Sequence, residues 1–142
     1  MRASFNGNTD IAQLSIQNNA DVDARDEDNQ TSLIKASFRG HADIVQWSVG
    51  NDADVDARDN DNATALIFAS TEGHIDILQL LIENHADIDA RDLNDATALI
   101  EAADHGRTDI AKFLLENSAE VDARDNANVT ALMGASYNGH ID

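Results

Sequence analysis

The sequence contains no cysteine and no proline, and only 4% of its 142 residues are aromatic. Without cysteine the chain has no disulfide framework and no thiolate chemistry, which is compatible with a reducing compartment. Without proline, no helix start has a preset backbone angle. Because aromatic residues are scarce, the core must consist mainly of leucine, isoleucine, valine and alanine, a composition that suits small, closely packed helices.

Basic residues are also scarce: 9 lysines and arginines stand against 27 aspartates and glutamates, so the formal net charge is −18 at pH 7. A surface this acidic repels nucleic acid and anionic lipid, so we expect neither nucleic acid nor a membrane as a partner. The N-terminus lacks the apolar core of a secretory signal, and no stretch is long and apolar enough to cross a bilayer. We therefore expect a soluble intracellular protein, located in the cytoplasm, that favours basic partners.

The most informative feature of the sequence is a repeat. The tetrapeptide Asp-Ala-Arg-Asp begins at Asp23, Asp56, Asp89 and Asp122, and each copy follows the last by 33 residues. A fixed period of this length is typical of stacked-repeat proteins, in which each unit contacts only its neighbours. We therefore predict a single domain over residues 1–142. It divides into a partial repeat at 1–25, full repeats at 26–58, 59–91 and 92–124, and a partial repeat at 125–142.

The sequence of each unit predicts two short helices and a turn, and residues 59–91 serve as the example. Thr64 is a good N-cap for a first helix, and Gly73 can adopt the left-handed conformation that ends it. Residues 74–84 have the apolar spacing of a second helix, whereas residues 86–95 lack helical periodicity and predict an extended segment with a tight turn. The residues expected to face inward are Leu66, Ala69 and Ser70 on the first helix and Ile77, Leu78, Leu80 and Leu81 on the second.

These units resemble the ankyrin repeat over the whole chain. The matching stretches in the third unit are Thr64-Ala-Leu-Ile, Ala69-Ser, Gly73-His, Ile77-Leu-Gln-Leu-Leu and Ala86-Asp-Ile-Asp. The resemblance implies an all-α fold, an ankyrin-repeat solenoid of stacked helix-turn-helix units joined by β-turn or hairpin loops. It also implies a protein–protein interaction scaffold without catalytic activity or a cofactor.

The chain departs from the family pattern in a regular way. The glycine of each turn is replaced by Asn29, Asn62, Asp95 and Asn128, and the glycine after each second helix by Asn19, Asp52, His85 and Ser118. Asparagine, aspartate and, less well, histidine tolerate a positive φ. We therefore expect the family's backbone geometry at most of these positions, with Ser118 as the exception.

The second repeat carries a predicted weakness. Ser48 occupies the column that holds Leu81 and Leu114 in later repeats. Gly50 is predicted to lie inside the second helix, where glycine costs about 1 kcal/mol relative to alanine. We therefore predict that the N-terminal half opens before residues 59–124.

The resemblance also indicates where a partner would bind. Ankyrin repeats share their scaffold columns and vary at the turn tips and on the first-helix face of the concave side, where they contact partners. The residues that vary at such positions and suit an interface are Phe38, Arg39, Phe68, Glu72, Leu93, Asp104, His105 and Tyr137. Aromatic side chains beside charged ones are typical of interface centres. The alternative is that this variation only marks unconstrained surface.

Other regular columns have structural explanations. Arg25, Arg58, Arg91 and Arg124 could form a ladder for an acidic partner, but the flanking aspartates and the adjacent repeat are expected to neutralise each one. The acidic turns lack the ligand spacing of an EF-hand, and the column of His41, His74 and His140 is a loop position that does not favour a metal site. No catalytic triad or phosphate loop is suggested, so we expect no enzyme.

Two functions fit these features. The first is a non-catalytic protein–protein interaction scaffold that presents an acidic concave surface to a protein partner with a basic or mixed-charge patch. The second is a structural or engineered repeat scaffold that self-associates end to end through its uncapped ends. The second hypothesis rests on the near-identical repeats and on the expected ends, because Met1 shares the column of Ile67 and Asp142 that of Asp76. The alternative explanation of these ends is a fragment cut from a longer array.

Overall fold

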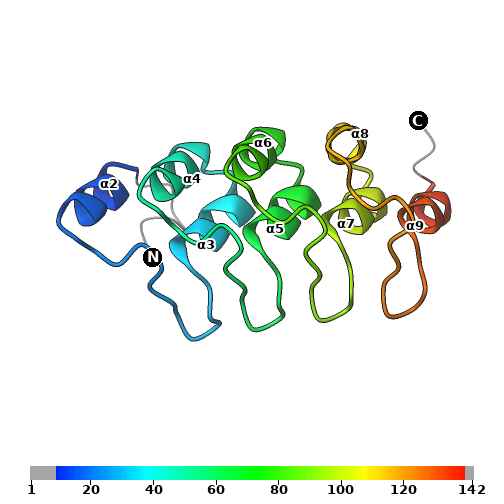
Figure 1. Cartoon of the computed structure of the whole chain (residues 1–142), viewed down its shortest axis with the longest axis horizontal. Coiled ribbons are helices and arrows are strands. Elements are labelled where there is room, and N and C mark those ends of the chain that lie inside the picture. The colour runs from blue at the N-terminus through cyan, green and yellow to red at the C-terminus, as the bar shows by residue number, and fades with distance from the viewer. Residues whose placement is uncertain (1–8, 140–142) are drawn as a thin grey trace.

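A computed structural model describes residues 9–139 of the chain. Within this range the regular structure is α-helical, and the helices form two rows (Figure 1). The first-helix row comprises α3 (Ser32–Arg39), α5 (Ala65–Glu72), α7 (Ala98–Asp104) and α9 (Ala131–Asn138). The second-helix row comprises α2 (Thr9–Gln17), α4 (Ala42–Val49), α6 (Ile75–Glu83) and α8 (Thr108–Glu116). The predicted all-α fold of stacked helix-turn-helix units is confirmed for these residues.

The helices are short. The longest of those described have 9 residues, and none between residues 9 and 139 is long and apolar enough to span a bilayer. The predicted placements of Met1 and Asp142 fall outside the described residues.

A threonine begins each of the four first helices. The Oγ1 atoms of Thr31, Thr64, Thr97 and Thr130 accept a hydrogen bond from the main-chain N–H three residues later, at 3.3 to 3.4 Å. This bond satisfies one of the N–H groups that a helix leaves unpaired in its first turn. Gly73 ends α5 with φ 85°, as predicted, because a left-handed residue turns the chain away from the helix axis.

The core runs along the stack between the two rows. Each inner first helix packs on the second helix of its own unit and on the first helices of neighbouring units. Of the residues predicted to face inward, Leu66, Ala69, Ser70, Ile77, Leu78 and Leu81 are buried, whereas Leu80 is only partly buried at the edge of the core. Helices this short cannot bury enough apolar surface within one unit, so the stability of each unit depends on its neighbours.

The chain keeps a glycine-type backbone at positions where it lacks glycine. The turn residues Asn29, Asn62, Asp95 and Asn128 have φ between 58° and 62°. Asn19, Asp52, His85 and Ser118, which follow the second helices, have φ between 61° and 70°. The left-handed conformation predicted for most of these positions is confirmed, and Ser118, which was named as the exception, adopts it as well. Ser118, with φ 70°, is the one member of the set whose residue type is not enriched in this region.

Gly50 does not lie inside a helix, and the sequence prediction is wrong at this point. Helix α4 ends at Val49, and Gly50 is its C-cap with φ −68° and ψ −9°. The equivalent helices α6 and α8 continue one residue further, to Glu83 and Glu116. Glycine loses more backbone entropy in a helix than other residues do, so α4 ends where the other helices continue.

A small cavity lies where the first two repeats meet. Ser48 is 0% exposed, and its Oγ has no hydrogen-bond partner within the described part of the chain. The cavity has a volume of about 70 Å³, and its lining includes Ala12, Ser15, Ile16, Ile44 and Ser48. In later repeats the equivalent Leu81 and Leu114 are completely buried. The cavity and the buried hydroxyl of Ser48 give a physical reason for the prediction that the N-terminal half opens first.

Candidate protein-binding surface

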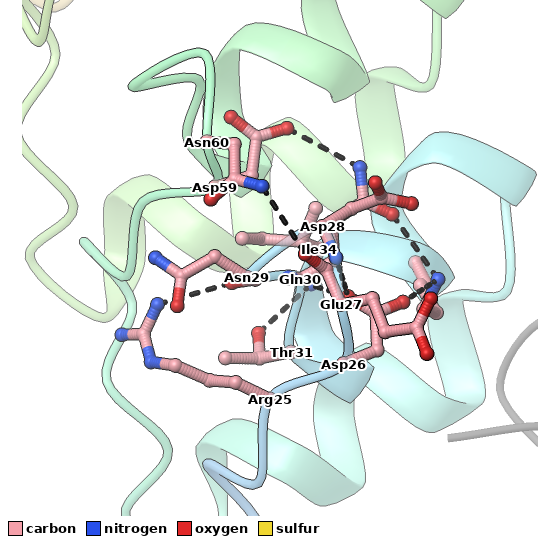
Figure 2. A network of polar contacts seen from close by, with 11 residues as sticks. Arg25, Asp26, Glu27, Asp28, Asn29, Gln30, Thr31, Ile34, Asp59 and Asn60 are labelled. Carbon is pink, nitrogen blue, oxygen red and sulfur yellow. Dashed lines mark hydrogen bonds and ion pairs between the residues drawn. The ribbon is translucent and has the colours of Figure 1, made fainter.

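An aspartate organises each of the turns that extend below the helices in Figure 1. Asp59 is buried, and its Oδ1 accepts hydrogen bonds from the N–H groups of Asp61 and Ala63, both at 2.9 Å. The other turns repeat this arrangement with Asp26, Asp92 and Asp125. Figure 2 shows it in the turn that leads from Arg25 to Thr31. The carboxylate supplies an acceptor that the turn backbone lacks, and so holds the turn in one conformation.

Arginine side chains connect successive turns. Arg58 Nη1 donates to the carbonyl oxygen of Asn62 in its own turn, at 3.1 Å, and to that of Arg91 in the next unit, at 2.7 Å. Arg25 and Arg91 make the equivalent pair of bonds. The predicted link to the adjacent repeat is therefore correct, but the acceptors are carbonyl oxygens where flanking aspartates had been expected. The reason is that those aspartates already accept main-chain N–H groups.

Two further contacts fix the spacing of the turns. The Asp56 carboxylate accepts a hydrogen bond from the N–H of Asp87 in the next unit, at 2.8 Å. The carbonyl oxygen of Asp61 accepts one from the N–H of Leu93, also at 2.8 Å. Equivalent bonds join the full units to one another and to the partial units at either end. Hydrogen bonds therefore connect the turns in a row, and they hold the residues at the turn tips in fixed positions.

An open hollow lies between the turn tips and the first helices. It has a volume of about 460 Å³ and is lined by Phe38, Asp61, Ala63, Ile67, Phe68, Thr71, Glu72, Asp92, Leu93, Asn94 and Glu101. These residues come from α3, α5 and α7 and from the turns that precede α5 and α7. We call this feature the tip hollow. It brings together four of the predicted site residues, namely Phe38, Phe68, Glu72 and Leu93.

Apolar side chains form one wall of the tip hollow. The ring centroids of Phe38 and Phe68 are 5.6 Å apart and the ring planes meet at 79°, an edge-to-face arrangement. The Arg39 guanidinium lies 5.2 Å from the Phe38 centroid, within the range of a cation–π contact. Phe38 is 38% exposed and Leu93 is 56% exposed. Solvent-exposed apolar groups of this size, gathered at a concavity, are typical of interaction sites.

Glu101 forms an acidic wall of the tip hollow, and the sequence prediction of the site missed it. Its Oε2 accepts a hydrogen bond from Thr71 Oγ1 at 3.3 Å and lies 3.6 Å from His105 Nδ1. Burial raises the pKa of Glu101, while the electrostatic interaction with His105 and the hydrogen bond from the Thr71 hydroxyl oppose that shift. The variation of this column could have identified Glu101 as a candidate. Successive units hold Lys35, Phe68, Glu101 and Gly134 at this position. The charge there changes sign along the stack.

The other predicted site residues do not line the tip hollow. Arg39 stacks on Phe38 beside it. Asp104 and His105 are at the end of α7, where Asn138 Nδ2 donates to the Asp104 carbonyl oxygen at 3.1 Å. Tyr137 lies on α9 and is 92% exposed. The predicted residues thus divide into a group at the tip hollow and a group beside α7 and α9.

Comparison with protein families establishes the relationship of the chain. The family model described as ankyrin repeats (3 copies) matches residues 1–92 and residues 84–142. The chain belongs to the ankyrin-repeat family. Ankyrin repeats generally mediate protein–protein interactions and are typically non-catalytic. A comparison with curated proteins gives no significant match.

Within this ankyrin-repeat protein, the tip hollow lies at the positions where the sequence predicted a binding surface. The resemblance indicated the turn tips and the first helices, and the hollow is built from both. The scaffold columns, by contrast, hold the threonine caps and the aspartate-organised turns. The constant columns of this ankyrin array therefore hold the residues that fix its helices and turns.

Proposed function

We propose that this ankyrin-repeat protein is a non-catalytic interaction scaffold that binds a protein partner through the tip hollow and the acidic surface around it. The observation that carries the proposal is the hollow itself, where exposed apolar side chains and carboxylates from consecutive units converge. Asp104, His105 and Tyr137 form the edge of the same binding surface, toward α9. Family membership supports the general function.

The charge of the chain supports a partner with a basic or mixed-charge patch. The formal net charge is −18. The described residues that line the tip hollow include Asp61, Glu72, Asp92 and Glu101 but no lysine or arginine. A field of this sign speeds the encounter with a basic partner, makes binding weaker at high salt, and disfavours nucleic acid and anionic membranes.

The rigidity of the turn row also supports a binding role. Hydrogen bonds from Arg58 and Asp56 fix neighbouring turns to one another, and Phe68 is held against Phe38. A surface that is ordered before the partner arrives loses little conformational entropy on binding. The binding free energy of the exposed anchors is therefore not offset by ordering of the scaffold.

Replacing Phe38 or Leu93 with alanine should weaken partner binding about tenfold or more, because each side chain presents exposed apolar surface to the tip hollow. The measurement is the Kd, by titration calorimetry, of peptides selected on the wild-type chain from a random phage-displayed library. Leu115→Ala is the matched control, since Leu115 is 45% exposed but lies on α8 in the other row. Affinity unchanged by Phe38→Ala and Leu93→Ala, in variants that remain folded, would refute the assigned surface.

A second candidate function is self-association through the exposed face of α9. Leu132 is 77% exposed, whereas the equivalent Leu33, Leu66 and Leu99 are 0%, 1% and 3% exposed inside the stack. This face therefore carries the side chain that other units bury against a neighbour, and a second copy of the chain offers such neighbours. Light scattering across a wide concentration range tests it. A mass that grows with concentration, but not in Leu132→Glu, supports self-association, and a monomer throughout refutes it.

A further inference from the structure

Repeats two and four place opposite charges at the same position of the first helix. In repeat two, Lys35 Nζ lies 2.6 Å from Asp26 Oδ2 and donates a hydrogen bond to Gln30 Oε1 at 3.2 Å. The hydrogen bond and charge of Lys35 lower the pKa of Asp26. In this repeat the chain itself provides a cation for the aspartate that organises the turn.

Repeat four has the same turn without that cation. Asp92 Oδ1 accepts two main-chain N–H groups of its turn, at 2.7 and 2.9 Å, as Asp26 Oδ1 does in repeat two. Two periods after Lys35, the helix position holds Glu101. Asp92 and Glu101 both line the tip hollow. The scaffold that pairs a carboxylate with an ammonium in repeat two therefore holds two carboxylates in repeat four.

The surroundings of Glu101 disfavour its negative charge. Burial is the main cause of its raised pKa, and the charges of Asp92 and Asp104 raise it further. The electrostatic interaction with His105 and the hydrogen bond from the Thr71 hydroxyl act in the opposite direction. A cation that entered the tip hollow would offset both the burial of the carboxylate and the repulsion between like charges.

We propose that the tip hollow takes a lysine or arginine side chain of the protein partner, with its charged end between Asp92 and Glu101, in the place equivalent to that of Lys35. This inference rests on the proposed function and specifies the residue type that the partner inserts. The alkyl part of the side chain packs against Phe68 and Leu93, and the charged end gains from the adjacent carboxylates. A bare metal ion would leave the apolar side chains of the hollow exposed to solvent. A long cationic side chain covers them and also places a positive charge beside the carboxylates of Asp92 and Glu101.

The test titrates the isotope-labelled chain with a capped pentapeptide, Ala-Leu-Lys-Leu-Ala, and follows the amide resonances by NMR. The control peptide carries norleucine in place of lysine and so keeps the alkyl chain without the charge. The lysine peptide should shift the amides of Phe68, Leu93 and Glu101 and bind at least about tenfold more tightly than the control, the factor expected for one charge-assisted hydrogen bond. Equal affinity of the two peptides would overturn the inference.

Glu101→Lys is the sharpest variant, because it supplies the cation from the chain itself, as in repeat two. It should fold with at least the thermal stability of the wild type and lose about tenfold or more of its affinity for the lysine peptide. Glu101→Gln keeps the shape of the side chain, removes its charge, and should also weaken lysine-peptide binding. Glu116→Lys makes the same change in net charge at an exposed position at the end of α8 and should leave the affinity roughly unchanged.

Failure of this inference can be distinguished from failure of the proposed function. One outcome is that the library peptides bind in a way that depends on Phe38 and Leu93 but contain no lysine or arginine. That result would support the proposed function and contradict the insertion of a cationic side chain. Losses of equal size in Glu116→Lys and Glu101→Lys would indicate diffuse attraction to the acidic surface, and would also overturn it. Loss confined to the Glu101 variants, together with the preference for lysine over norleucine, supports it.

Discussion

Asp59→Ala is expected to lower the free energy of unfolding by about 3 kcal/mol, because it removes the acceptor that organises a central turn. Asp59 is 6% exposed, and its carboxylate accepts hydrogen bonds from the N–H groups of Asp61 and Ala63, at 2.9 Å each, and from Gln30 Nε2 at 3.2 Å. Alanine leaves these donors without their partner in a largely buried place, where unpaired polar groups are costly. Urea-induced unfolding measures the loss.

Two variants isolate the role of the Asp59 carboxylate. Asp59→Asn keeps an acceptor oxygen for the two main-chain donors. It loses the charge and replaces Oδ2, the acceptor of the Gln30 Nε2 hydrogen bond, with an NH2 donor, so about half of the destabilisation should remain. Asp61→Ala removes an exposed carboxylate from the same turn and should change stability by less than about 0.5 kcal/mol. If Asp59→Ala were as stable as Asp61→Ala, the aspartate would not organise the turn.

Ser48→Leu is expected to raise the free energy of unfolding by about 2 kcal/mol, an effect opposite to that of most core substitutions. It removes a buried hydroxyl that has no partner within residues 9–139, and it places apolar atoms beside a cavity of about 70 Å³. Each buried methylene contributes about 0.8 kcal/mol, partly offset by the entropy that the leucine side chain loses. Leu81 and Leu114 show that this position of the repeat accommodates leucine.

Hydrogen exchange locates the effect of Ser48 in the stack. In the wild type, residues 26–58 should be less protected than residues 59–124, and Ser48→Leu should narrow the difference. Ser48→Ala removes the hydroxyl without filling the cavity. It should therefore raise the free energy of unfolding by about 1 kcal/mol, less than Ser48→Leu does. Lower stability in Ser48→Leu, or equal protection of the two halves in the wild type, would contradict a packing weakness in repeat two.

The helices and turns of this chain could be predicted because their causes are local. Thr64 caps a helix through a bond to the residue three positions later, and Asn62 and Gly73 adopt left-handed conformations that few residue types tolerate. Gly50 shows the limit of such rules, since its low helix propensity moved the end of α4 by one residue. The residue at which a helix ends depends on a small difference in free energy between the helical and non-helical states of one residue. The existence of the helix depends on the interactions of the whole repeat.

The bonding of the arginines could not be predicted from sequence proximity. Arg58 has aspartates close to it in the chain, yet its guanidinium donates to carbonyl oxygens in two turns. The competition is decided by main-chain N–H groups, which occupy the Oδ1 atoms of Asp56 and Asp59. Only the stacked geometry shows which acceptors remain within reach.

The candidate site was predicted in part for a related reason. Comparing columns identifies positions that vary, and Phe38, Phe68 and Leu93 were found in this way. It does not show which variable residues from different units converge, so Glu101 was missed although it shares a hollow with Phe38. It also does not show which of the selected residues line the hollow, and Tyr137, on α9, does not.

The most direct test of the central claim is an NMR shift map of the labelled chain saturated with the tightest peptide from the random library. Binding at the tip hollow predicts that the largest shifts form one continuous set around Phe38, Phe68, Leu93 and Glu101. Shifts confined to the outer face of α6 and α8, or to the exposed face of α9 around Leu132, would contradict the claim that this ankyrin-repeat protein binds its partner through the tip hollow.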